Sequence, residues 1–210
     1  MTVRYSDVLG SLRAAYDAEA DDRESRAGAK SAWKLAERTA FLVRMRADGR
    51  RDLLELGAGT GHDSLFFKEE GIDVVAIDLS PRMVEHCLAK GIDARVADFL
   101  HLGFPEASFD AVYALNSLLH VPNADIDPVL ASVRSVMRPA GLFFLGVYGG
   151  RSHEGPLEND DHIPPRHFSL RTDEELQSLV TRHFEVVDFH TVVMPTNDLH
   201  FQSLTLRRPT

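Results

Sequence analysis

The chain has 210 residues, of which 44% are hydrophobic and 26% charged, as in an ordinary soluble globular protein, and it is long enough for one large domain with a substantial core. The formal net charge of −9 excludes a basic footprint for nucleic acid over the whole chain. The single cysteine, Cys87, excludes an intrachain disulfide and a thiolate metal cluster.

The first 49 residues predict two helices that belong to the same domain as the rest of the chain. Apolar side chains recur at helical spacing over residues 4–17, at Val8, Leu12, Ala15 and Tyr16. The polar stretch that follows, "AEADDRESRAGAK", is expected to be a solvated linker or a mobile lid. A second helix is expected to begin after Ser31 and to end at about residue 47.

From residue 50 the pattern changes to an alternation of strands and helices. Strands are expected at "DLLEL", "DVVAI", "DARVAD", "FDAVYAL" and "LFFLGVY", with helices at residues 62–70, 81–90 and 126–137 and a turn at "RPAG". Apolar strands separated by helices indicate a parallel sheet that is covered on both faces.

The alternation lapses after residue 148. Residues 149–171 hold prolines, glycines and charges without periodicity and predict a long loop, of the kind that is usually either functional or disordered. A helix follows, with Thr172 and Glu175 as its capping box. The β-rich runs "FEVVDFHTVVM" and "LHFQSLTLRR" then predict an antiparallel hairpin, and no domain boundary is visible within residues 50–208.

The stretch "LLELGAGTGHDSLFF" predicts a strand that enters a glycine-rich turn and leaves it as a helix, which is a site for a bound cofactor. Gly57, Gly59 and Gly61 are spaced G-x-G-x-G, and His62 stands where the dinucleotide fingerprint needs its last glycine. No Gly-Lys-Ser/Thr follows, as a phosphate loop would require, and Glu55 would repel a pyrophosphate. The turn therefore favours a ligand with an amine or a sulfonium at this end.

Residues 55–61, "ELGAGTG", resemble motif I of the class I S-adenosylmethionine-dependent methyltransferases. Four more motifs of that family follow in order: the acid Asp78 in "AIDLSPRMV", the "ADF" of residues 97–99, the fourth-strand motif "FDAVYALNSLLHV" and the fifth-strand motif "RPAGLFFLGVY". The first acid lies about 20 residues after the first glycine, the spacing typical of a ribose-binding acid. The resemblance is close over residues 50–148 and loose over the closing hairpin.

The resemblance implies an α/β fold: a doubly wound, Rossmann-like, seven-stranded, mostly parallel sheet with a C-terminal antiparallel hairpin. Residues 50–210 would form the methyltransferase domain, with an acceptor-side loop at about 149–171 and residues 1–49 as N-terminal lid helices. The implied cofactor is S-adenosyl-L-methionine, and the product is S-adenosyl-L-homocysteine.

The resemblance also implies roles for individual residues. In family terms Asp78 holds the ribose hydroxyls, Asp98 meets the adenine amino group and Phe99 contacts the adenine ring. The methionine part of the cofactor is expected to lie against Gly57, Gly59 and Gly61, where any Cβ would collide with it. Further expected cofactor contacts are Glu55, Ala58, Leu79, Met83, Ala97, Trp33 and Asn116. Asn116, directly after the fourth strand, is expected to touch either the methionine end of the cofactor or the acceptor.

Methyl transfer from a sulfonium needs alignment first, and a base only for a protonated acceptor. His120 is the candidate catalytic base because it follows the fourth strand, where the ligand crevice opens; a packing role is the alternative. Trp33 is expected either to shield the sulfonium or to pack its helix, and Tyr16 to pack. The loop histidines, His153, His162 and His167, match no metal template, so an acceptor-side cover is favoured and no metal is expected.

The expected acceptor is a small molecule, since the chain is acidic, has no nucleic-acid module and has a short acceptor region. One alternative is a methyltransferase that acts on RNA or protein, for which the Arg-rich segments at 44–51 and 207–208 are the only hints. Another is a non-catalytic protein that binds S-adenosylmethionine. The sequence has neither a signal-peptide core nor an apolar run of transmembrane length, so a cytoplasmic location without a membrane partner is expected.

Overall fold

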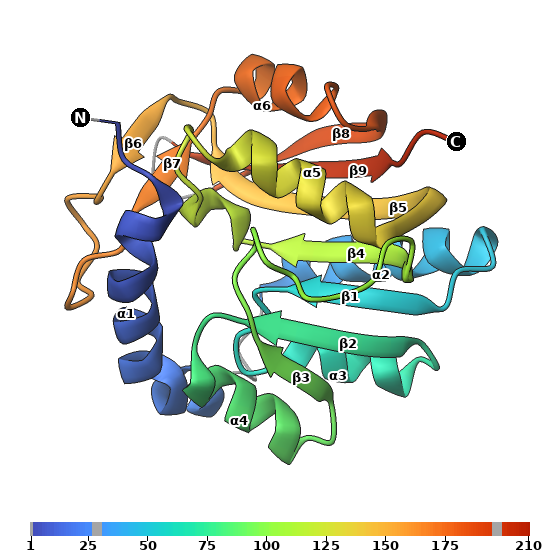
Figure 1. The fold of residues 1–210 in the computed structure, drawn as a ribbon, viewed down its shortest axis with the longest axis horizontal. Coiled ribbons are helices and arrows are strands. Elements are labelled where there is room, and N and C mark those ends of the chain that lie inside the picture. The colour runs from blue at the N-terminus through green and yellow to red at the C-terminus, as the bar shows by residue number, and fades with distance from the viewer. Residues whose placement is uncertain (1, 27–30, 195–198) are drawn as a thin grey trace.

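The computed structural model describes residues 2–26, 31–194 and 199–210, and their central element is a seven-stranded sheet of order β3-β2-β1-β4-β5-β9-β8 (Figure 1). Five strands run parallel: β1 (Asp52–Leu56), β2 (Asp73–Asp78), β3 (Asp93–Val96), β4 (Phe109–Leu115) and β5 (Met137–Gly149). Strand β9 (His200–Arg207) lies antiparallel between β5 and β8 (Glu185–Val193). This is the expected doubly wound α/β fold.

Helices cover both faces of the sheet, as the apolar strands require. α5 (Ile126–Val136) and α6 (Asp173–Val180) lie in front in Figure 1, and α2 (Ala32–Ala47) and α3 (His62–Glu69) lie behind. Alternate residues of one strand serve the two faces: Leu53 belongs to the core cluster that includes α2 and α3, and Leu54 to the core cluster that includes α5 and α6. α4 (Pro81–Ala89) packs on β2 and β3 through Val84 and Cys87.

The first helix, α1 (Tyr5–Ser25), lies across the carboxyl ends of the parallel strands (Figure 1). The expectation of a solvated linker is therefore wrong for residues 18–25, which are helical, and the alternative of a lid stays a prediction; residues 27–30 lie outside the described residues. The stretch is helical because its charges have partners on a neighbouring helix. Asp21 contacts Arg82 and His86 of α4 at 3.1 and 2.9 Å.

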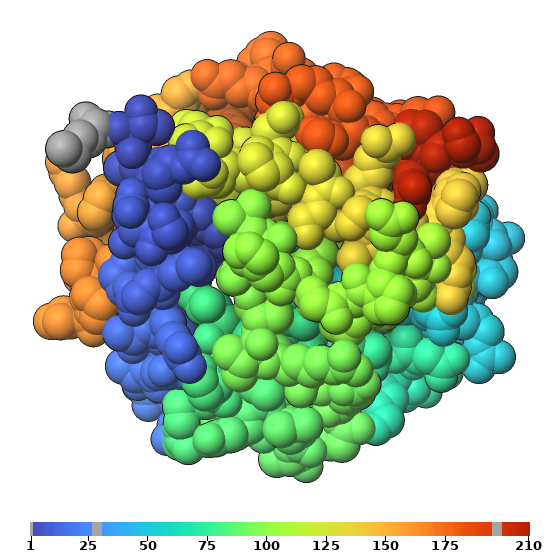
Figure 2. All heavy atoms as spheres, viewed as in Figure 1, coloured from blue at the N-terminus to red at the C-terminus, as the bar shows by residue number. Residues whose placement is uncertain are grey.

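Both ends of α1 are held by hydrogen bonds and ion pairs. At its start, Asp125 accepts the backbone N–H of Tyr5 at 2.6 Å and pairs with Arg4 at 2.5 Å. Near its end, Glu24 pairs with Lys90 at 2.7 Å. Figure 2 shows α1 as a continuous ridge that meets α4 at one end and the segment around residue 120 at the other.

Three local features differ from expectation. The loop at 149–171 contains two short antiparallel strands, β6 (His153–Gly155) and β7 (Phe168–Leu170), which are too short to show periodicity. The "RPAG" turn is part of β5, where Ala140 has a positive φ of 59° and the pairing with β4 shifts register. Ser31 precedes α2 but makes no side-chain capping bond, whereas the capping box of Thr172 and Glu175 on α6 is confirmed.

Candidate active site

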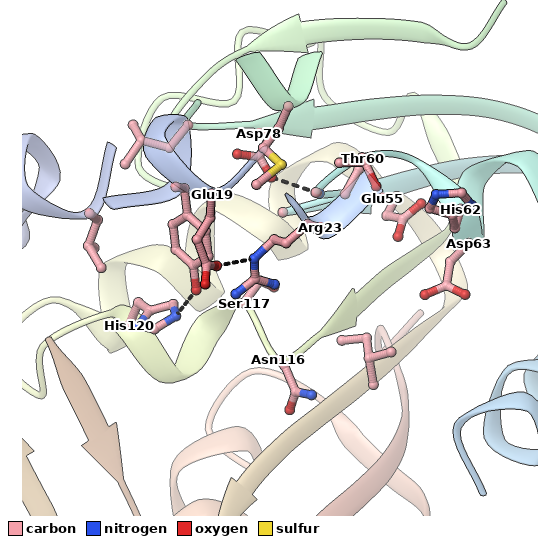
Figure 3. A pocket seen from close by; sticks show the side chains of 18 of the residues that line it. Glu19, Arg23, Glu55, Thr60, His62, Asp63, Asp78, Asn116, Ser117 and His120 are labelled. Carbon is pink, nitrogen blue, oxygen red and sulfur yellow. Dashed lines mark hydrogen bonds and ion pairs between the residues drawn. The ribbon is translucent and has the colours of Figure 1, made fainter. Parts of the chain in front are cut away.

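A cavity of about 550 Å³ opens at the carboxyl ends of β1, β2 and β4, beneath α1 (Figure 3). Its size is ordinary for a small-molecule site. Most of the residues that the sequence predicts for the site line this cavity, namely Glu55, Gly57, Ala58, Gly59, Asp78, Leu79, Met83, Phe99, Asn116 and His120. Four predicted residues do not belong to the lining: Trp33, Gly61, Ala97 and Asp98.

The three glycines of the turn all have positive φ, but they are needed for different reasons. A Cβ on Gly57 would lie 2.5 Å from Ser117 Cβ, and one on Gly61 would lie 2.8 Å from Cys87 Sγ. At Gly59 no atom of the described chain lies within 4 Å of that position. The protein's own packing therefore already excludes a side chain at Gly57 and Gly61, and contact of the cofactor with the three glycines stays a prediction.

Trp33 and Asp98 are engaged in packing and turn formation. The centroid of the Trp33 ring lies 4.5 Å from that of Phe201 in β9, and this contact holds α2 against the sheet. Asp98 Oδ1 accepts the backbone N–H groups of Leu100 and His101 at 2.8 and 3.0 Å, which stabilises the turn after β3. Their roles toward a cofactor stay predictions.

Asp78 ends β2 with its carboxylate buried at the cavity wall. Oδ2 accepts the N–H of Gly59 at 2.8 Å, and Oδ1 accepts the N–H of Ser80 at 2.9 Å. Burial raises the pKa of Asp78 to about 6, and the two N–H donors lower it in part. Asp78 therefore joins the glycine turn after β1 to the start of α4 in one polar site.

Two polar atoms after β4 fit a ligand that brings hydrogen-bonding groups. Asn116 Oδ1 and Ser117 Oγ are buried at the cavity, and neither has a hydrogen-bond partner in the described part of the chain. Buried polar atoms cost stability when they lack partners. The amide oxygen can accept from an ammonium group, as in the methionine part of S-adenosylmethionine. With the open position at Gly59, the residues present fit that cofactor.

His120 lies in a short 3₁₀ turn, η2 (Leu118–His120), and is bonded on both ring nitrogens. Nδ1 lies 2.6 Å from the carbonyl oxygen of His167, which only accepts, so Nδ1 carries the proton. Burial lowers the pKa of His120 to about 3, so the ring is neutral and Nε2 accepts. The donor to Nε2 is the Tyr16 hydroxyl at 2.5 Å.

Tyr16, which the sequence assigns to helix packing, is thus a cavity residue held from both sides. Its oxygen also accepts Arg166 Nη1 at 3.2 Å. Burial raises the pKa of Tyr16, while Arg166 and Arg23 oppose that rise. The hydroxyl is therefore protonated at neutral pH and is directed by His120.

The acceptor-side loop is attached to α1 through Asp160. Its carboxylate binds Arg166 Nη2 and His162 Nδ1, each at 2.7 Å. His162 Nε2 in turn lies 2.8 Å from Glu19 of α1. The loop is therefore attached to the helix that lines the cavity, and its role as an acceptor-side cover stays a prediction.

The sequence reading missed Glu19 and Arg23 of α1 as cavity residues. A signal was present: Tyr16, Glu19 and Arg23 are spaced three and four apart and share one helical face. That face is polar although it points into the protein. A polar face on a buried side of a helix indicates a ligand cavity.

Comparison with known proteins relates the central part of the chain to methyltransferases. Residues 53–141 match the model of a family described as a methyltransferase domain. The chain is 34% identical over 136 residues to 27-O-demethylrifamycin SV methyltransferase of Amycolatopsis mediterranei, which covers 60% of this chain and 48% of the relative. It is 36% identical over 112 residues to ubiquinone biosynthesis O-methyltransferase of Xanthomonas axonopodis pv. citri, with 50% and 46% covered. The chain thus spans about half the length of these curated relatives.

A solved structure resembles almost the whole chain. The crystal structure of Burkholderia thailandensis 1,6-didemethyltoxoflavin-N1-methyltransferase, with bound 1,6-didemethyltoxoflavin and S-adenosylhomocysteine, superposes with a TM-score of 0.73 at 25% identity. The match covers 95% of this chain and 88% of that one. Within the described residues, no helix is both long and apolar enough to cross a membrane.

Proposed function

We propose that this chain, which belongs to the class I S-adenosylmethionine-dependent methyltransferase family, transfers a methyl group from S-adenosylmethionine to a small organic acceptor. The observation that carries the proposal is one continuous cavity with two kinds of wall. The wall at Gly59, Asp78 and Asn116 fits the cofactor, and the wall at Tyr16 and His120 remains for an acceptor. A cavity of this size also argues against a cofactor-binding protein whose acceptor site has closed.

The residues on the cofactor side have distinct tasks. Asp78, ionised above its pKa of about 6, would accept from the ribose hydroxyls. Asn116 Oδ1, which has no other partner in the described chain, would accept from the ammonium group. When bound, the cofactor supplies a methyl group that its sulfonium already activates, so these residues mainly have to orient it.

The acceptor side orients a nucleophile and gives little help in removing its proton. The Tyr16 hydroxyl can receive a proton from the acceptor while it passes its own to His120 Nε2. A histidine with a pKa of about 3 holds that proton weakly, so His120 is a poor proton sink. We therefore assign Tyr16 and His120 chiefly to positioning and propose an acceptor whose nucleophile is unprotonated when it reacts.

Three of the similar proteins support a small acceptor through their names: a demethylrifamycin, a ubiquinone precursor pathway and a didemethyltoxoflavin. The acceptor atom differs among them, being oxygen in two and nitrogen in the third. For either atom, alignment with the methyl group of the cofactor is the main requirement.

Calorimetric titration with S-adenosylmethionine and S-adenosylhomocysteine tests cofactor binding. A second assay incubates the protein and S-adenosylmethionine with each member of a panel of phenols, amines and hydroxy acids and measures the S-adenosylhomocysteine that forms. We expect micromolar binding of both, a tenfold or greater loss in Asp78→Ala, and turnover with at least one panel member. Absence of binding would refute the cofactor assignment. Binding without turnover on any small acceptor, but with turnover on RNA or protein, would refute the small-molecule assignment.

A further inference from the structure

Asp17 of α1 reaches the start of α4 and binds it at two points. Its Oδ1 atom accepts a hydrogen bond from Ser80 Oγ and another, at 3.3 Å, from the backbone N–H of Arg82. Ser80 is fully buried and Asp17 is half-buried. In the described part of the chain neither of these two residues belongs to the cavity lining, and the function proposed above uses neither.

The first turn of α4 explains why an acid from another helix is placed there. The first N–H groups of a helix have no partner within the helix itself. The N-cap residue, Ser80, accepts the N–H of Met83 at 3.1 Å through its hydroxyl oxygen. Pro81 has no N–H, and the N–H of Arg82 is the one that Asp17 accepts. A carboxylate is also favoured electrostatically at a helix N-terminus, so Asp17 completes the cap of α4.

Ser80 connects Asp17 to the wall of the cavity. Its backbone N–H donates to Asp78 Oδ1 at 2.9 Å, while its hydroxyl donates to Asp17. The other oxygen of Asp78 accepts the N–H of Gly59 at 2.8 Å. A side chain of α1 therefore holds in place one of the two N–H donors that orient the Asp78 carboxylate.

The orientation of the Asp78 carboxylate matters because its proposed partner is a pair of neighbouring hydroxyl groups. A carboxylate has about four lone-pair sites, so both oxygens can still accept from a ligand after each has accepted an N–H. The 2′- and 3′-hydroxyls of a ribose can then each donate to one oxygen. Hydrogen bonds weaken steeply when they are misaligned, so a rotated carboxylate would lose one of the two hydroxyls.

Asp21, one turn further along α1, contacts α4 in a different way. Its carboxylate pairs with the guanidinium of Arg82 at 3.1 Å and lies 2.9 Å from His86. Both partners are side chains on the flank of α4. Asp21 therefore docks α1 on α4 without contacting Ser80, whereas Asp17 reaches the residue that holds Asp78.

We propose that Asp17 is a positioning residue for ribose recognition, which acts through Ser80 to hold the Asp78 carboxylate in the orientation that meets both hydroxyl groups. The inference rests on the proposed function, in which Asp78 accepts from the ribose of the cofactor. Because Asp17 belongs to α1, the docking of this helix and the recognition of the ribose are linked.

The test compares adenosine with 2′,3′-dideoxyadenosine, which differ only in the two hydroxyl groups. Both are uncharged, so removal of the Asp17 charge by itself has little effect on their binding. Calorimetric titration of wild type should show a preference for adenosine of about tenfold or more. Asp17→Ala should reduce this preference to about threefold or less, and Asp17→Asn, which keeps an acceptor oxygen, should retain it within about twofold.

Asp21→Ala is the matched control, because it removes an acid of α1 that contacts α4 but not Ser80. Any loss of affinity in Asp21→Ala should be equal for the two nucleosides, so that the wild-type preference is kept. A second measurement needs no ligand: amide hydrogen exchange of Ser80, read by NMR, should be about tenfold faster in Asp17→Ala and within about twofold of wild type in Asp21→Ala. Circular dichroism melting verifies that each variant is folded.

The result with wild type separates this inference from the proposed function. If wild type prefers adenosine and Asp17→Ala keeps that preference, whether or not both affinities fall, the inference is wrong and the proposed function stands. If wild type binds the two nucleosides equally or not at all, the ribose assignment of Asp78 fails. Exchange at Ser80 then decides the contact: faster exchange in Asp17→Ala supports the positioning of Asp78 by Asp17, and unchanged exchange refutes it.

Discussion

Asp78 and His120 line the same cavity, and burial moves their pKa values in opposite directions. Burial disfavours the charged form of each, so the pKa of Asp78 rises to about 6 and that of His120 falls to about 3. The imidazole is therefore neutral across the physiological range, while the carboxyl group changes its charge near pH 6. A titrating step of ligand binding near pH 6 is therefore expected from Asp78.

Affinity for S-adenosylhomocysteine should fall as the pH decreases below about 6. Protonation of Asp78 removes an acceptor that the ribose hydroxyls would use, so the affinity is expected to decrease by up to about tenfold per pH unit. Calorimetric titration between pH 5 and 8 measures this. Asp78→Asn should bind weakly at every pH and show no step; a step of the same size in Asp78→Asn would assign the titration to another group.

The sequence predicts where these two residues lie but not how they are charged. Asp78 ends β2 and His120 lies in the turn after β4, and the carboxyl ends of parallel strands meet at one edge of the sheet. Their burial depends on α1, and the partner that sets the hydrogen bond of His120 Nε2 is 104 residues away in the chain. Hydrophobic periodicity carries no information on a contact between residues so far apart in the chain. From periodicity alone, Tyr16 is therefore predicted to pack its helix.

At the scale of elements, the acceptor-side loop and α1 form one connected unit. Asp160 binds Arg166 and His162, and these two side chains contact Tyr16 and Glu19 of α1. Because the helix lines the cavity, ordering of the loop and ordering of the cavity wall are coupled. Neither segment shows the coupling in its own sequence, since each reads as a polar stretch with mixed charges.

Asp160→Asn should therefore loosen α1 as well as the loop. The variant loses the charge that holds Arg166 and His162, and we expect amide hydrogen exchange over residues 16–25 to become about tenfold faster or more. Exchange read by mass spectrometry measures this. Asp161→Asn, at the exposed neighbouring residue, is the control. Unchanged protection of α1 in Asp160→Asn would show that its contacts with α4 and Asp125 hold the helix without the loop.

For the whole molecule, the arginines that could favour a macromolecular substrate are mostly neutralised. They lie around the amino-terminal ends of the strands, at the opposite end of the sheet from the cavity. Their partners are carboxylates of the same surface, in the pairs Arg46–Glu70, Arg50–Asp110, Arg51–Asp73 and Arg207–Asp48. A surface of paired charges gives little attraction for a polyanion, which favours the small acceptor.

The free energy of unfolding of the whole fold depends on pH, and the contribution of His120 to this dependence has a definite sign. Its pKa is lower in the folded than in the unfolded chain, so its contribution is complete above about pH 6.5 and is lost as the pH falls toward 3. His120→Asn should reduce the slope of the unfolding free energy against pH by up to about 1.4 kcal/mol per pH unit between pH 4 and 6.

Urea titrations across that range measure the slope. Asp78 acts in the opposite sense, since its raised pKa stabilises the fold at low pH and that contribution is lost as the pH rises through about 6. An unchanged slope in His120→Asn would mean that the imidazole is hydrated in the folded protein.

The position of β9 has a consequence for how the protein is made. β9 is the seventh strand of the sheet in chain order, yet it lies between β5 and β8 and pairs with both. During translation β5 therefore keeps an open edge, and β8 has no partner, until residues 200–207 have left the ribosome. A nascent chain arrested before residue 200 would present that apolar edge to chaperones or to other nascent chains.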